Sequence, residues 1–107
     1  MNIQDTIIRA VEIKKKYDTL NKKNGIEWKG QDFMSGFVGD VGDLSKLVMA
    51  KHGLRGSSDV DTELAHELAD CLWSVCVLAS EYKIDLETAF INTMNELDLR
   101  LDKQMQS

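Results

Sequence analysis

The stretch ELADCLWSVCVLAS, residues 67–80, begins with two acids and continues as a segment that is almost entirely apolar. Glu67 and Asp70 are three positions apart, which makes them neighbours on one face of an α-helix. The apolar segment from Cys71 to Ser80 is long enough to predict a helix buried on most of its sides. Carboxylates next to such a segment are costly to bury unless a cation satisfies them. The stretch therefore predicts both a core helix and a place where a cation could bind.

A second acidic pair with the same spacing occurs earlier, in FVGDVGDL at residues 37–44. Asp40 and Asp43 have apolar or small neighbours, including Phe37 and Leu44, whereas acids that decorate a solvated surface would be flanked by polar residues. Four acids converging from two helices would form the oxygen-rich site that suits Mg2+. From the residues alone, two interpretations remain open: a functional metal site, and an acidic seam in a subunit interface.

The whole chain is predicted to be all-α. It has no proline, and its apolar residues recur with a helical period rather than by alternation. We predict four helices, over about residues 2–20, 31–51, 59–82 and 85–102, with residues 104–107 fraying at the end. Asp59 or Asp61 could cap the third helix, and Asp85 marks the start of the fourth. These segments form a single domain over residues 1–107.

Composition limits which cellular location and which binding partners we expect for this protein. At 107 residues and 43% hydrophobic content, a single layer of helices would leave much apolar surface uncovered, which predicts an oligomer. The net charge of −5 argues against nucleic-acid binding. No signal-peptide pattern and no membrane-spanning apolar run is present, and the spacing of Cys71 and Cys76 favours two reduced thiols over a disulfide. We therefore expect a cytoplasmic protein with no membrane association.

The two acidic stretches also resemble the signature of a known enzyme family. FVGDVGDL at 37–44, followed by ELADCL at 67–72, is similar to the ExxE and ExxD helices of the MazG-like nucleotide pyrophosphohydrolases. These enzymes belong to the all-α NTP pyrophosphatase superfamily, which includes dCTP pyrophosphatases and dimeric dUTPases. IDLETAF at 84–90 also resembles the start of the last helix of that family, so the resemblance covers about residues 30–95.

The resemblance implies a role for each of the four acids. Asp40 and Asp43 correspond to the glutamates of ExxE, and Glu67 and Asp70 correspond to ExxD. All four are thereby implied to be catalytic and to bind Mg2+, for which Mn2+ could substitute. The implied reaction is hydrolysis of a nucleoside triphosphate to a monophosphate and pyrophosphate, as a house-cleaning activity on the nucleotide pool. The implied assembly is a helical bundle formed by a homodimer or a dimer of dimers.

This chain departs from the family pattern at the first motif. Aspartate is one methylene shorter than glutamate, so the carboxylates of Asp40 and Asp43 are withdrawn by roughly 1 Å or more. Either the helices approach more closely, which Gly36, Gly39 and Gly42 would permit, or the metal binds more weakly.

Four further residues are candidates for substrate binding. Trp28 could stack on a base, as loop aromatics do in relatives, or it could simply cover a helix end. Lys51 could hold phosphate oxygens or could be a solvated lysine. Asn92 and Asn95 lie where relatives carry polar groups near the nucleotide.

Two other functions fit the same residues. One is a non-catalytic helical binding or interaction protein on the same scaffold. The other is a metal–carboxylate bundle that performs different phosphate chemistry. Pyrophosphate release from a panel of nucleotides would discriminate between these hypotheses and the favoured one.

Overall fold

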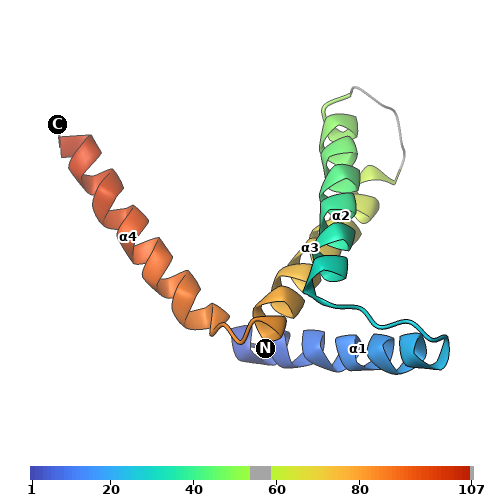
Figure 1. The fold of residues 1–107 in the computed structure, drawn as a ribbon. Helices are drawn as coiled ribbons and strands as arrows, with labels where there is room; N and C mark the ends of the chain where they lie inside the picture. Colours follow the sequence, from blue (N-terminus) through green and yellow to red (C-terminus); the bar gives the residue numbers. More distant parts are fainter. Residues whose placement is uncertain (54–58, 107) are drawn as a thin grey trace.

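The computed structural model describes residues 1–53 and 59–106, and this part of the chain contains four α-helices and no strand. The helices are α1 (Ile3–Lys23), α2 (Gly30–Lys51), α3 (Val60–Glu81) and α4 (Leu86–Gln106) (Figure 1). The all-α, four-helix prediction is confirmed. The expected fraying of residues 104–107 is wrong as far as Gln106, because α4 continues to that residue; Ser107 lies outside the described residues.

Short polar side chains set where two of the helices begin. Asn2 and Asp5 form a reciprocal capping box at α1: the Asp5 amide donates to Asn2 Oδ1 at 2.9 Å, and the Asn2 amide donates to Asp5 Oδ2 at 3.2 Å. Asp85 accepts from the amide and the hydroxyl of Thr88 at 3.1 and 2.9 Å, ahead of α4. These hydrogen bonds lower the pKa of Asp85. The helix start predicted at Asp85 is confirmed.

The core lies where α3 meets α1 and α2. α2 and α3 run side by side, and α1 packs across the C-terminal half of α3 (Figure 1). Cys76 and Val77 of α3 are completely buried, and Ala10 of α1 and Phe33 of α2 close the core from either side. The burial predicted for the apolar half of this helix is confirmed for Ser74, Cys76, Val77 and Ala79, whereas Leu72 is 52% exposed.

A glycine allows the start of α2 to approach the end of α3. Gly30 is buried, and a Cβ at this position would collide with the hydroxyl of Tyr82. Any larger residue would have to displace the tyrosine ring. The absence of a side chain at Gly30 therefore makes room for the Tyr82 ring beside the start of α2.

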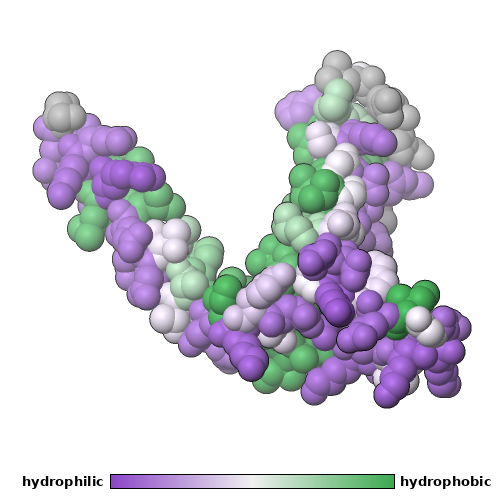
Figure 2. All heavy atoms as spheres, in the orientation of Figure 1, coloured by the Kyte–Doolittle hydropathy of each residue, from purple (hydrophilic) through white to green (hydrophobic). Residues whose placement is uncertain are grey.

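The fourth helix stands apart from the other three. It runs away from the body of the molecule and has no buried residue (Figure 1). Near its start, Gln4 Nε2 of α1 donates to Glu87 Oε2 at 2.6 Å. Apolar side chains along it, including Phe90, Met94 and Leu101, are 40–55% exposed, and Figure 2 shows apolar surface both on α4 and on the α2–α3 pair. The bundle expected from dimerisation stays a prediction, since a single chain leaves these surfaces uncovered.

Among the described residues, no helix has the length and apolar character that crossing a membrane requires.

Candidate metal centre

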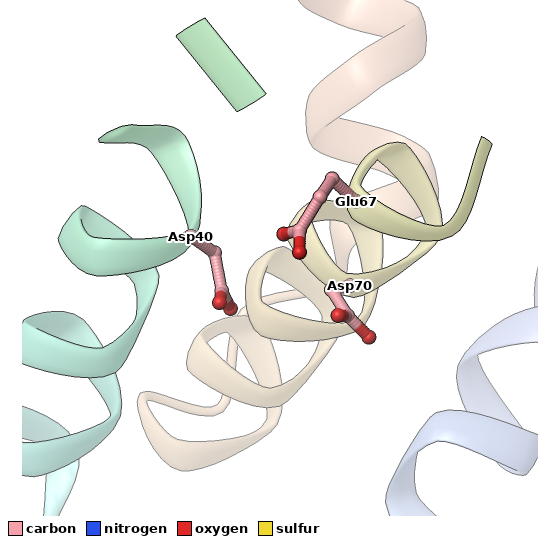
Figure 3. A group of neighbouring side chains, drawn as sticks. All are labelled: Asp40, Glu67 and Asp70. Carbon is pink, nitrogen blue, oxygen red and sulfur yellow. The ribbon is translucent and has the colours of Figure 1, made fainter. Parts of the chain in front are cut away.

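Three of the four predicted acids meet between α2 and α3. Asp40 projects from α2 toward Glu67 and Asp70 on α3 (Figure 3), and one carboxylate oxygen from each lies within 4.8 Å of the others. All three side chains are partly buried. The i, i+3 spacing brings Glu67 and Asp70 to one face of α3, and the packing of α2 against α3 supplies Asp40 from the opposite side.

Burial and negative charge dominate the electrostatics of this group, and the charge of His66 lowers the pKa of Asp40 and Glu67 only as the smallest of the causes. Burial raises the pKa of Asp40, and the charges of Asp70 and Asp43 raise it further. Burial also raises the pKa of Glu67, followed by the charges of Asp70, Asp40 and Asp43. Among the described residues, Glu67 Oε2 is buried with no hydrogen-bond partner. A buried carboxylate oxygen without a partner, facing two other carboxylates, is a site that a hard cation would satisfy.

Asp43 lies beside this group rather than in it. Its side chain is exposed, one helical turn further along α2, yet its charge raises the pKa of both Asp40 and Glu67. It borders a cleft of about 510 Å3 on that side of the group, which is lined by Asp43, Lys46, Leu47, Thr62, Glu63, His66 and Glu67. The structure therefore brings three of the predicted ligands together and leaves the fourth within electrostatic range.

His66, an exposed residue of α3, contacts the acidic group. Its Nε2 lies 3.1 Å from Asp70 Oδ2, and its side chain is 73% exposed. The i, i+4 spacing between His66 and Asp70 is the signal that could have identified this contact, because side chains at that spacing are neighbours on a helix. The imidazole orients one oxygen of Asp70 and leaves the other available.

An aromatic cleft adjoins the acids on the other side. It has a volume of about 340 Å3 and is lined by Tyr17, Asn21, Trp28, Phe33, Gly36, Asp40, Trp73 and Ser74. The rings of Trp28 and Phe33 meet edge to face with centroids 5.5 Å apart, and Phe33 meets Trp73 at 6.4 Å. Asp40 belongs both to this cleft and to the acidic group, so the two form one continuous site. Trp28, a predicted substrate-binding residue, stands in this cleft.

The other three predicted substrate-binding residues lie elsewhere. Lys51 forms an exposed ion pair with Asp61, at the end of α2. Asn92 and Asn95 are exposed on α4, the helix that runs away from the acids, and neither lines the two clefts described above. Within one described chain, these three residues do not reach the acidic group.

Gly36, Gly39 and Gly42, the three glycines inside α2, do not bring it closer to α3. A Cβ built at Gly39 or Gly42 would meet nothing within 4 Å, and one at Gly36 would make only an ordinary contact with the Trp28 ring. These three glycines therefore leave open space on α2, and Asp40 reaches Glu67 and Asp70 without a close approach at any of them.

Comparison with known proteins identifies the domain. Residues 31–104 match the family model of the MazG nucleotide pyrophosphohydrolase domain. This range includes all four predicted acids and nearly all of α2, α3 and α4, whereas α1 and the loop that carries Trp28 precede it. Neither the curated proteins nor the solved structures gave a match.

Proposed function

Because the chain belongs to the MazG nucleotide pyrophosphohydrolase family, we propose that it hydrolyses nucleoside or deoxynucleoside triphosphates to monophosphates and pyrophosphate in a Mg2+-dependent reaction. One observation supports this above the others: the buried, unpartnered oxygen of Glu67 faces Asp40 and Asp70 across the α2–α3 contact. Removal of unwanted nucleotides from the pool is the role that we propose for this activity.

The acids would hold Mg2+, and their chemistry fits that ion. Asp40, Glu67 and Asp70 offer hard carboxylate oxygens, and the negative charge of Asp43 acts on the same group. When bound, Mg2+ neutralises phosphate oxygens and lowers the pKa of the attacking water. Without a cation, the same four negative charges would repel a triphosphate, so the chain's own residues require one.

The chain's carboxylates also provide for proton transfer. A carboxylate that is not fully used by the cation can accept the proton of the attacking water. Burial and neighbouring negative charge raise the pKa of Asp40 and Glu67 in the cation-free protein. A bound cation would lower these pKa values again, so the base would be a carboxylate that does not bind the cation directly. His66 holds one oxygen of Asp70 and so restrains the direction of that carboxylate.

The aromatic cleft is suited to the nucleoside. A nucleotide whose phosphates lie at the acids would place its base near Trp28, because Asp40 borders both regions. Trp28 is 42% exposed, which leaves part of its indole face available for stacking.

We also propose that the active form is a homodimer or a dimer of dimers. The apolar stripe of α4 is uncovered in the single chain, and a second copy of the α2–α3 pair has matching exposed apolar residues such as Val41 and Leu72. In such an assembly, Asn92 and Asn95 of one copy could approach the acids of another.

The test is incubation of the protein with Mg2+ and each of the common ribo- and deoxyribonucleoside triphosphates, with pyrophosphate and phosphate measured separately. Pyrophosphate as the product, abolished by EDTA, is the expected result. Release of single phosphates would favour different metal–carboxylate chemistry, and binding of nucleotides with no hydrolysis would favour a non-catalytic binding protein.

A further inference from the structure

The aromatic cleft beside the acids contains two polar side chains to which the reaction assigns no role. Ser74 of α3 is only 4% exposed, and Asn21 of α1 is partly buried; both line the cleft. Polar side chains placed in a cleft with aromatic walls can donate hydrogen bonds to, and accept them from, the edge of a bound ligand.

The walls around these groups are held in place. Trp73 donates its indole N–H to the Ala10 carbonyl at 3.1 Å, and its ring packs against Tyr17 with centroids 5.6 Å apart. Phe33 is 4% exposed and contacts both tryptophans. Fixed aromatic walls with a few placed polar groups are typical of sites that recognise a flat ring with polar atoms at its edge.

We propose that the Asn21 amide and the Ser74 hydroxyl recognise the hydrogen-bonding edge of the nucleobase and determine which base this protein accepts. The inference rests on the proposed function, because Asp40 ties the cleft to the site for the phosphates. Asn21 lies outside the residues that match the family model, so this part of the selectivity comes from α1, which precedes the family domain.

The sharpest variant is Asn21→Asp, which keeps the shape of the side chain and replaces its N–H donor by an acceptor. Cytosine and adenine carry an amino donor where thymine and guanine carry a carbonyl acceptor. The variant should therefore raise kcat/KM for cytosine and adenine nucleotides relative to thymine and guanine nucleotides by about tenfold, the effect of one exchanged hydrogen bond. Ser74→Ala should lower, by a similar factor, the ratio of kcat/KM between the nucleotide with the most favoured base and the one with the least favoured base.

Matched controls separate recognition from charge and helix effects. Asn24→Asp makes the same chemical change three residues further on, and Ser80→Ala makes the serine change on the exposed end of α3; neither residue lines the cleft. These two variants should leave the ratios between bases unchanged. The inference would be overturned by a variant that lowers kcat/KM by the same factor for the nucleotides of all four bases. It would also be overturned by a variant that behaves like its control.

A binding measurement keeps this test independent of hydrolysis. Calorimetric titration with the nucleoside monophosphates of the four bases should show the same reordering in Asn21→Asp as the kinetics. If the wild-type protein releases no pyrophosphate from any nucleotide, the proposed function fails, and base-dependent monophosphate binding that Asn21→Asp reorders would still uphold the recognition role. Monophosphate affinities that do not depend on the base, or that Asn21→Asp leaves in the same order, would overturn it.

Discussion

α3 and α4 are almost equal in length, at 22 and 21 residues, yet they have opposite environments. α3 buries Val60, Ser74, Cys76, Val77 and Ala79, and it supplies two of the three acids that meet. α4 has a clear apolar stripe but buries nothing within the described chain. An amphipathic helix gains stability only from the surface it packs against. A single chain therefore brings three acids together between α2 and α3, whereas it leaves the apolar stripe of α4 uncovered.

The largest effect is expected from removing one of the two acids that α3 contributes to the acidic group. Asp70→Asn keeps the shape of the side chain and removes one negative charge from the group. We expect pyrophosphohydrolysis to fall by more than about 100-fold, the upper range for loss of a supporting residue around a metal. Helical circular dichroism should be unchanged. Retained activity in this variant would contradict the proposed metal site, and Asp61→Asn, at the exposed ion pair with Lys51, is the matched control.

The next effect concerns α4. Phe90→Glu places a charge in the middle of the apolar stripe, where it is 55% exposed in the single chain. If a second copy covers this stripe, the variant should halve the mass measured by light scattering. Lys103→Gln, on another side of α4, lowers the net charge equally and should leave the mass unchanged. A wild-type protein that is already monomeric would refute the proposed dimer.

Two glycines of α2 provide a smaller and internally controlled test of packing. Gly30→Ala should lower the free energy of unfolding by about 0.5–1.5 kcal/mol, because its Cβ would push the Tyr82 side chain out of its present position. Gly42→Ala meets nothing within 4 Å and should raise it by up to about 1 kcal/mol through better helix propensity. Chemical denaturation of both variants measures the difference. A loss of stability or of dimer mass in Gly42→Ala would show that a second copy contacts this open side of α2.

The smallest effect is in the pH dependence of stability without divalent cations. The pKa values of Asp40 and Glu67 are raised above their ordinary values of 3.8 and 4.5, so the folded state binds more protons than the unfolded state in the range just above those values. Their contribution to stability therefore increases as pH falls through the raised pKa values and is complete below the ordinary ones. Thermal denaturation in EDTA should show this gain for the wild type relative to the double variant Asp40→Asn, Glu67→Gln.

Adding Mg2+ should have the opposite pH dependence, because the cation binds the deprotonated acids. At neutral pH it should raise the melting temperature of the wild type, because a ligand of the folded state stabilises it by mass action. This gain should shrink as the acids become protonated at lower pH, since protons and the cation compete for the same oxygens. A melting temperature that Mg2+ shifts equally in the double variant would contradict binding at these acids.

The amino-acid pattern was sufficient to predict the helices and the burial of α3. The absence of proline and the helical period define the helices, and the apolar run after Asp70 can be satisfied only in a core. Helix ends were less predictable: α1 continues to Lys23 and α4 to Gln106, because residues of good helix propensity extend both helices beyond their apolar stripes.

The candidate site also has features that the sequence predicts and features that depend on the packing of the helices. Spacing within one helix is local, so the sequence by itself determined that Glu67 and Asp70 share a face and that His66 could reach Asp70. The rotation and offset of α2 against α3 are not local, since they depend on contacts such as Gly30 with Tyr82. Only the tertiary structure decided that Asp40, and not Asp43, completes the group, and that Trp28, Asn21 and Ser74 share a cleft with it. The physical reason is that side-chain periodicity defines the face of a helix, whereas packing defines what that face meets.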